Sequence, residues 1–390
     1  MFTEQGLAEA LGGQVCRLRF PGFTEEVIMS SLPKSVEIRD DTMREGLQIE
    51  SKDIPVSEKL RLLDALGETG LKVISIGSFV SPRWTPQMAC IDEIAEKFVP
   101  KPGITYTAAV FNQRGFERAD KYYPKINVRT RQYMTHVEVG RIFSMRNYNR
   151  TPEQLLLEGD TAIQRARQDG VKSGAIMLGN PFGSNFEGDF TLEQSLAVLK
   201  EVMDRWHEHG LTVNSCRIID DMGACMPDQL TEMLSVIAER WPEITDFGLH
   251  LHNQRGVTNI SYYQALKFGV THFDTSLGGL GGCPYCGNGR SAGHVPTEDF
   301  VYMCEEMGIE TGLDLDKLIE AAAIAEEVVG HPLWGHVSKA GPRPRGKTLY
   351  PKDMPFVETL EEASHFRKGP SVYAHQVKPW KEGTALASEL

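Results

Sequence analysis

Short runs of β-branched and apolar residues alternate with amphipathic segments from about residue 35 onward, and the alternation repeats about eight times. Apolar runs of about four to eight residues are typical of buried strands, whereas apolar residues recurring roughly every three or four positions are typical of helices. Strands are expected at 36–39, 72–77, 104–110, 134–139, 174–178, 215–220, 246–252 and 272–276. Helices are expected at 57–67, 86–98, 113–121, 152–168, 192–209, 228–240 and 260–268.

This alternation predicts an α/β fold, a closed (β/α)8 TIM barrel, rather than an open doubly wound sheet. No GxGxxG turn follows the first predicted strand, which argues against a dinucleotide-binding Rossmann fold. We expect a catalytic barrel at 33–330, preceded by an N-terminal leader at 1–32. An irregular, Gly- and Pro-containing C-terminal extension is expected at 331–390, either as a solvated tail or as a segment that covers the barrel, its site or a subunit interface.

Composition narrows the function. The 390 residues are 41% hydrophobic and carry a formal net charge of -12, which argues against a nucleic-acid-binding protein because such proteins present a basic face. No apolar run reaches the roughly 18 residues that cross a bilayer, so no membrane partner is expected and the default location is cytoplasmic. The seven cysteines are odd in number and mostly scattered, unlike a secreted disulfide framework.

Candidate chemistry gathers at the predicted carboxyl ends of strands, where TIM barrels carry their active sites. His250 and His252 are two apart on a strand, so their side chains project from one face and can bind one metal ion. Glu45 offers a carboxylate ligand after the first strand, and Arg44 beside it suits a developing enolate or carboxylate oxygen, unless the two form only a surface ion pair. Cys283 lies in a glycine-rich loop after the last strand, where a thiol can act as acid or base.

Further polar residues at these strand ends are candidates for contacts with substrate. They are Gln48, Ser75, Ser78, Asn112, Arg141 and, in the loop after the last strand, Arg290.

Four segments in chain order resemble one enzyme family. They are DTMREGLQIE at 41–50 with the strand before it, SFVSPRWTPQM at 78–88, NQRGFE at 112–117 and GGLGGCPY at 278–285. Together they resemble 3-hydroxy-3-methylglutaryl-CoA (HMG-CoA) lyase, a member of the TIM-barrel metallolyases that also include isopropylmalate synthases and 4-hydroxy-2-oxovalerate aldolases. The resemblance covers roughly residues 33 to 330.

The resemblance implies a metal-dependent carbon–carbon lyase that works by a retro-Claisen or retro-aldol step through an enolate. Glu45, His250 and His252 would then bind a divalent metal. By the same resemblance, Arg44 would stabilise the enolate, Asp220 would position or deprotonate the substrate hydroxyl, and Cys283 would exchange a proton with the enolate carbon.

The chain departs from the family pattern at several of these positions. Glu45 replaces an aspartate, and His294 replaces an asparagine ligand. The third imidazole either binds the metal or faces the substrate. If it binds the metal, it favours zinc, manganese or ferrous iron over magnesium. Ser75 and Arg141 stand where the lyases have glutamates, and a longer loop adds Arg290. These changes indicate a more anionic substrate than standard HMG-CoA, such as a di- or tricarboxylate or its CoA thioester.

Two other functions remain open from the sequence. The same site can run in the condensing direction, joining an acyl-CoA to a 2-oxo acid, or the barrel can be a non-catalytic binding protein whose site has drifted. Cys283-Pro-Tyr-Cys286 is also a CxxC motif, which suggests redox chemistry or a structural zinc site. We expect a small anionic substrate, an unresolved divalent ion (Mn, Zn, Mg or Fe) and a homodimer or higher homo-oligomer.

Overall fold

The computed structural model describes residues 16–18, 27–29, 32–287 and 293–349. The chain divides into two compact units, Met1–Gly335 and His336–Leu390. The described part of the second unit contains α12 (Val337–Ala340) and the short 3-10 helix η5 (Gly346–Thr348). Strands β1 (Cys16–Leu18) and β2 (Val27–Met29), which pair antiparallel, fall within the predicted leader.

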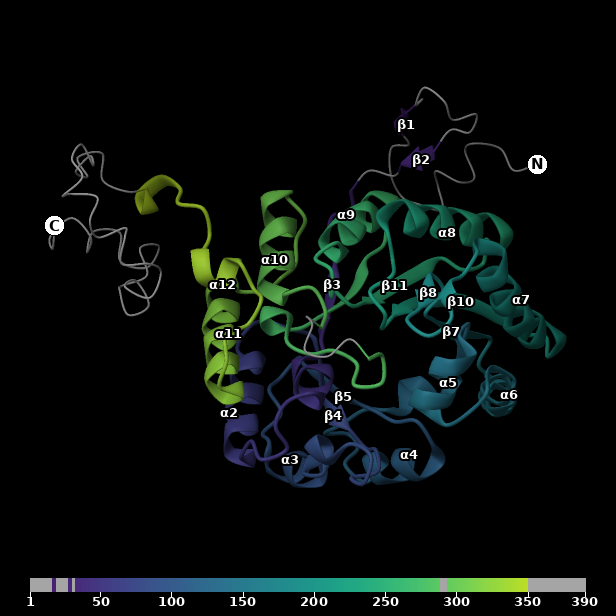
Figure 1. Cartoon of the computed structure of the whole chain (residues 1–390), viewed down its shortest axis with the longest axis horizontal. Coiled ribbons are helices and arrows are strands. Elements are labelled where there is room, and N and C mark those ends of the chain that lie inside the picture. The colour runs from purple at the N-terminus through teal and green to yellow at the C-terminus, as the bar shows by residue number, and fades with distance from the viewer. Residues whose placement is uncertain (1–15, 19–26, 30–31, 288–292, 350–390) are drawn as a thin grey trace, which may run out of the picture. The chain divides into compact units, whose positions relative to one another are not determined.

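Eight parallel strands form the main sheet of the first unit, in the order β5-β4-β3-β12-β11-β10-β7-β6. Helices lie between successive strands and surround the sheet (Figure 1), so the predicted (β/α)8 barrel is confirmed. All eight predicted strands are present, as β3 (Glu37–Asp40), β4 (Val73–Ser78), β5 (Thr105–Ala109), β6 (Met134–Glu138), β7 (Ser173–Gly179), β10 (Thr212–Asp220), β11 (Asp246–Leu251) and β12 (His272–Thr275).

The last strand closes on the first. β12 pairs in parallel with β3, with Asp274 opposite Arg39 and Thr275 opposite Asp40. Because every strand of this sheet runs in the same direction, the carboxyl ends of all eight meet on one face of the barrel. That face holds the polar residues considered below.

All seven predicted helices are also present, although the one expected at 86–98 is divided into a 3-10 turn and a short helix. The barrel helices are α2 (Val56–Gly67), η2 (Pro86–Met88), α3 (Ile91–Lys97), α4 (Gln113–Asp120), α5 (Arg141–Tyr148), α6 (Pro152–Gln168), α7 (Leu192–Glu208), α8 (Pro227–Arg240), α9 (Thr258–Phe268), α10 (Thr297–Glu306) and α11 (Leu315–Val329). Within the described ranges, none of them is both long and apolar enough to cross a membrane.

Three of these helices, α5, α10 and α11, were not predicted. α5 shows why: Glu187, from a distant segment, accepts hydrogen bonds from the backbone N–H groups of Arg141 and Ile142 at the start of the helix, at 3.1 and 3.0 Å. A negative side chain on the first free N–H groups stabilises a helix N-terminus. Since that carboxylate comes from another part of the fold, no local signal in the sequence marks the start of α5.

Side chains of the helices pack against the sheet in one hydrophobic core. Trp206 of α7 is fully buried over Gly174 of β7, and its indole N–H donates to the hydroxyl of Thr135 on β6 at 3.1 Å. A Cβ atom at position 174 would lie only 2.1 Å from the indole ring, so glycine is the one residue that leaves room for it. This contact fixes α7 over the strands that end at the site.

Candidate functional site

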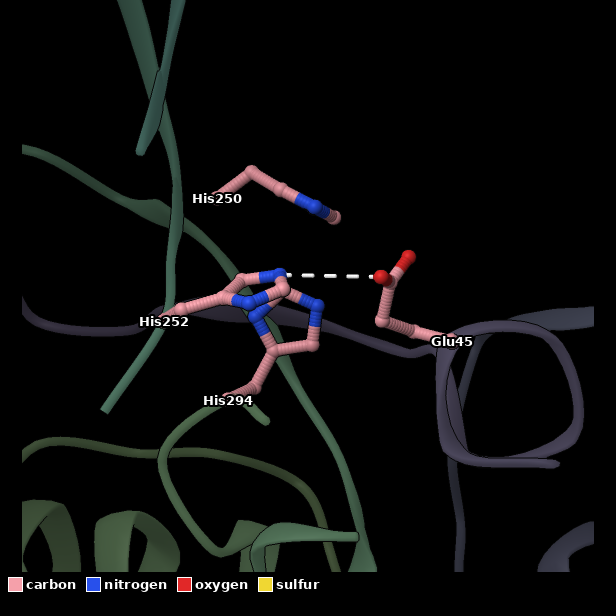
Figure 2. Close-up of side chains that lie close together, drawn as sticks. All are labelled: Glu45, His250, His252 and His294. Carbon is pink, nitrogen blue, oxygen red and sulfur yellow. Dashed lines mark ion pairs between the residues drawn. The ribbon is translucent and has the colours of Figure 1, made fainter. Parts of the chain in front are cut away.

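Three imidazoles and one carboxylate converge at the carboxyl ends of the strands (Figure 2). His250 lies on β11, His252 follows it directly, and His294 is joined to His252 by an antiparallel bridge. The ring centroid of His294 is 4.2 Å from that of His250 and 4.9 Å from that of His252. Oε1 of Glu45 lies 3.7 Å from Nε2 of His252. All four residues predicted as metal ligands are therefore buried side by side.

Glu45 reaches this cluster from an unusual turn. Residues Thr42–Gly46 form a single π-helical turn, η1, in which the backbone N–H groups of Glu45 and Gly46 donate to the carbonyl of Asp41 at 2.8 and 3.1 Å. Single π-turns are rare and frequently lie at functional sites. The turn sets Arg44 and Glu45 side by side, with the guanidinium of Arg44 paired to the Glu45 carboxylate.

In two of the rings, those of His250 and His294, the Nδ1 atom takes part in a hydrogen bond. Nδ1 of His294 donates to the carbonyl of Leu251 at 3.1 Å, and Nδ1 of His250 is 2.7 Å from the Asp274 carboxylate. Such bonds leave Nε2 with its lone pair available. Nε2 of His252 and of His294 is buried without any hydrogen-bond partner. Buried nitrogens of this kind are uncommon in proteins unless a ligand completes them.

Burial also keeps the rings of His252 and His294 neutral. It lowers the pKa of His294 to about 3, with the neighbouring His250 adding to the shift. Burial, reinforced by His294, lowers the pKa of His252 well below its usual value. Only the neutral imidazole binds a metal. The unpartnered nitrogens, the neutral rings and the adjacent carboxylate together fit a divalent cation held by Glu45, His250, His252 and His294.

A buried charge network lies behind His250. Asp274 on β12 pairs with Arg39 on β3 and with Arg217 on β10, the latter at 2.7 Å. Although burial opposes its ionisation, these two guanidinium groups hold the pKa of Asp274 well below its usual value. Asp41, with Oδ2 3.6 Å from Nδ1 of His250, forms a second potential ligand group with His250 and Asp274.

The glycine-rich loop carries Cys283 close to η1. Gly281, two residues earlier, has a φ of +126, and a Cβ atom there would lie 3.0 Å from the carbonyl oxygen of Glu45. Only glycine tolerates both that conformation and that approach. Cys283 itself is buried in a small cluster with Phe143, Met222 and Cys286.

The structure differs from the expectation for Asp220. Its carboxylate accepts hydrogen bonds from the backbone N–H groups of Met222 and Cys225, at 3.1 and 2.7 Å, and stabilises the turn after β10. Burial raises the pKa of Asp220 to about 7. The next residue, Asp221, instead has Oδ1 3.6 Å from Nε2 of His252. The turn therefore presents Asp221, and not Asp220, to the histidine cluster.

Two of the predicted substrate contacts, Ser75 and Gln48, are buried. Ser75 lies on β4 with its hydroxyl lacking a hydrogen-bond partner, and Gln48 follows η1. A third, Ser78, is buried at the end of β4 and donates to the carbonyl of Ala109 at 3.4 Å.

The remaining predicted contacts lie elsewhere. Asn112 caps α4, its side-chain oxygen accepting from the N–H of Gly115 at 2.8 Å. Arg141 is exposed and pairs with Glu153 at 2.8 Å, so it does not reach the cluster, because it begins α5 and points to solvent. Arg290 lies outside the described residues.

The sequence analysis did not identify two groups near the cluster, the carboxyl group of Glu138 and the phenol of Tyr148. Glu138, the last residue of β6, is buried and accepts from the Asn180 amide at 3.1 Å, and burial raises its pKa. Burial, with the charges of Asp221 and Glu138, raises the pKa of Tyr148 well above its usual value. Glu138 is the last residue of a strand, and the same criterion, a polar residue at the carboxyl end of a strand, selected the other candidates and could have found it. Glu138 and Asp221 thus supply two carboxylates near the cluster, at positions other than Ser75 and Arg141.

Comparisons with known proteins converge on one family. The sequence model of the family described as HMGL-like matches residues 35–325. Hydroxymethylglutaryl-CoA lyase YngG of Bacillus subtilis is 32% identical over 304 residues, covering 77% of this chain and 95% of the relative. (R)-citramalyl-CoA lyase of Chloroflexus aurantiacus is 32% identical over 321 residues, covering 79% and 96%. A solved HMG-CoA lyase from Acinetobacter baumannii, in complex with coenzyme A and 3-methylmalate, superposes with a TM-score of 0.67 at 26% identity, covering 84% of this chain and 100% of that one.

Proposed function

The chain belongs to the HMGL-like family, and on that premise we propose that it is a divalent-metal-dependent carbon–carbon lyase that cleaves a hydroxyacyl-CoA thioester. One observation carries the proposal. Glu45, His250, His252 and His294 meet in a buried cluster with two unpartnered imidazole nitrogens, beside Arg44 and the Cys283 loop.

The metal is held, in this proposal, by Glu45 and the three histidines. When bound it acts as a Lewis acid that polarises the oxygens of the substrate. Three nitrogen ligands favour zinc, manganese or ferrous iron over magnesium, which prefers an all-oxygen shell.

The protein residues move the protons. Asp221 takes the proton of the substrate hydroxyl. We assign this role to Asp221 and not to Asp220 because Oδ1 of Asp221 lies 3.6 Å from Nε2 of His252. The bond between C2 and C3 then breaks, and its electron pair passes to the thioester as an enolate whose charge Arg44 faces. Cys283 gives its proton to the enolate carbon, which leaves a carbonyl product and an acyl-CoA. The proton gained by Asp221 balances the one lost by Cys283.

The proposal that the substrate is a CoA thioester rests on the relatives. Both curated relatives act, by name, on CoA thioesters, and the Acinetobacter enzyme was solved with coenzyme A and 3-methylmalate. Within this class we propose a substrate other than standard HMG-CoA. Glu45 and His294, which lie in the cluster, and the buried Ser75 support this choice, because each differs from the residue of the lyase pattern at its position.

A substrate panel tests the proposal. Metal-reconstituted protein is incubated with HMG-CoA, with both enantiomers of citramalyl-CoA and with the corresponding free hydroxy acids, and products are followed by mass spectrometry. We expect cleavage of a thioester other than HMG-CoA to a carbonyl compound and an acyl-CoA. Preferred cleavage of HMG-CoA would contradict the substrate assignment. CoA released only when an acyl-CoA and a 2-oxo acid are both present would instead identify a condensing acyltransferase.

A pair of histidine variants tests the metal site. His252→Ala removes a buried ligand, whereas His207→Ala removes a surface histidine paired with Glu243. We expect the first to lose both stoichiometric metal and lyase activity, and the second to keep both. If the wild type binds no divalent ion and His252→Ala changes neither activity nor ligand binding, the chain is a binding protein on a drifted barrel. Light scattering of the same samples tests the expected homo-oligomer.

A further inference from the structure

The geometry points to a modification site within the glycine-rich loop: we propose that Cys283 and Cys286 form a reversible disulfide when the protein meets a peroxide. The proposal goes beyond the lyase function. It rests on that function only for its effect on activity, because the disulfide itself is detected independently.

The backbone already brings the two cysteines within bonding range. The N–H of Cys286 donates to the carbonyl of Cys283 at 3.3 Å, so residues 283–286 form a hydrogen-bonded turn. The end Cα atoms of such a turn lie less than about 7 Å apart. Disulfides span Cα separations of about 4.4 to 6.8 Å. The two cysteines also lie together in one small buried cluster, and the neighbouring Cys283 thiol is the main cause of a raised pKa at Cys286.

Neighbouring groups hold the loop in this arrangement. The thiol of Cys286 donates to the carbonyl of Asp221 at 3.1 Å, and the amide of Asn185 donates to the carbonyl of Cys286 at 2.9 Å. Nε of Arg146 donates to the carbonyl of Tyr285 at 3.2 Å. These three bonds hold the Tyr285–Cys286 end of the CxxC segment, and the turn hydrogen bond from the Cys286 N–H joins that end to Cys283.

The alternative for a CxxC motif, a structural zinc ion, lacks ligands. Across the described ranges, neither Cys283 nor Cys286 belongs to a group of three side chains that could hold a metal. The two thiols instead pack against Phe143 and Met222. An apolar shell around two neighbouring thiols suits a disulfide, which is itself uncharged and apolar.

The reaction balances with a peroxide as oxidant. Cys283 keeps 6% of its surface exposed and Cys286 none, so Cys283 reacts first. Its sulfur attacks one peroxide oxygen and the O–O bond breaks. Cys283 becomes a sulfenic acid, and one water molecule is released. The Cys286 sulfur then attacks that sulfur, the S–S bond forms, and a second water leaves. Two thiols are oxidised while hydrogen peroxide is reduced to two waters, and a dithiol reductant reverses the change.

The disulfide has two consequences for the loop. Cys283 can no longer carry the proton assigned to it, and Cys286 gives up its hydrogen bond to Asp221. The protein in its oxidised form is therefore expected to be inactive until it is reduced.

Peptide mapping tests the proposal. The reduced holoenzyme is treated with limiting hydrogen peroxide, remaining thiols are alkylated, and the protein is cut with trypsin. No Lys or Arg lies between 268 and 289, so both cysteines fall in one peptide, 268–290. We expect this peptide to lose the mass of two hydrogens and both alkylation sites, and dithiothreitol to restore them. If both thiols remain alkylatable while other cysteines oxidise, or if Cys283 passes directly to sulfonic acid, the proposal is wrong.

Two matched variants separate this proposal from the lyase assignment. Cys286→Ser removes the partner thiol, so we expect no linked peptide and a peroxide inactivation that dithiothreitol reverses poorly, because Cys283 is oxidised further. Cys225→Ser, which changes a buried cysteine in the barrel core, should keep the linkage. An intact linkage in a protein without lyase activity would refute only the proposed function. An active lyase without linkage would refute only the disulfide.

Discussion

The carboxylate of Asp274 governs how His250 faces the candidate metal site. It accepts from Nδ1 of that ring and is itself held by Arg39 and Arg217. Such carboxylate–histidine pairs fix the tautomer and raise the affinity of the ring for metal.

Asp274→Asn should therefore weaken divalent metal binding by roughly 10- to 100-fold. Competition with a chromophoric chelator measures the change. The matched control is Asp246→Asn, because Asp246 also pairs with a histidine, His272 at 2.9 Å, but at the start of β11, the opposite end from His250. Equal affinities in wild type and Asp274→Asn, with unchanged circular dichroism, would refute this role.

Asp40 provides a test of stability against pH. Burial raises its pKa to about 7, while Thr42 and Thr297 donate hydroxyl hydrogen bonds to it. The unfolded chain releases that proton near 3.8, so between these pH values unfolding releases one proton. The stabilisation by the protonated carboxyl is complete below 3.8 and is lost as pH rises to about 7.

Relative to Asp40→Asn, which does not titrate, the wild type should lose about 1.4 kcal/mol of unfolding free energy for each pH unit in that window. Urea unfolding at several pH values between 4.5 and 8 measures the difference, with the window set by the value of about 7. A difference that stays constant across the series would show that Asp40 is ionised throughout.

Single residues also show what the sequence could reveal. His250 and His252 were predictable because alternate strand residues share a face. The choice of Asp220 over Asp221 was not, since the turn after β10 decides which carboxylate faces the histidines. The exposed position of Arg141 was not predictable for a similar reason, because the helix that it begins was not recognised.

At the scale of elements, α7 depends on a missing side chain in β7. Gly174→Ala would push a methyl group into the buried indole of Trp206 and should cost about 1–3 kcal/mol of unfolding free energy. Gly67→Ala is the matched control, because its new Cβ would approach the flexible side chain of Lys101, at 2.8 Å, and would otherwise make an ordinary contact with the Tyr106 hydroxyl, at 3.4 Å. A glycine-to-alanine change in a helix is otherwise neutral or stabilising, by up to about 1 kcal/mol. Denaturant unfolding compares the two, and equal stabilities would contradict the packing argument.

Strands such as β4 were predictable because nearly all of their residues are buried, which favours a short run of mostly apolar residues. Irregular elements were not. The π-turn η1 depends on three N–H groups that share the carbonyl of Asp41, and α5 depends on Glu187. These two elements position Arg44, Glu45 and Arg141. The sequence therefore predicted the strands and helices of the barrel better than the irregular segments that orient the candidate side chains.

For the whole molecule, metal binding should add to stability. The four proposed ligands come from η1, β11 and the segments after β11 and β12, so an ion would join distant parts of the barrel. A ligand that binds only the folded state stabilises it by about 2.7 kcal/mol at a concentration 100 times its dissociation constant. Removing the ion with a chelator should lower the thermal midpoint, and adding zinc or manganese should restore it. His252→Ala, the matched control, should show no shift, and an equal shift there would place the ion elsewhere.

The pairing of β12 with β3 has a consequence for how the protein is made. Glu45 leaves the ribosome early, whereas His294 appears only after the last strand of the barrel. Contacts this distant in sequence form late in folding. In the proposed site, a nascent or truncated chain that ends before His294 lacks one of the four ligands, so it should bind the ion more weakly than the complete barrel does.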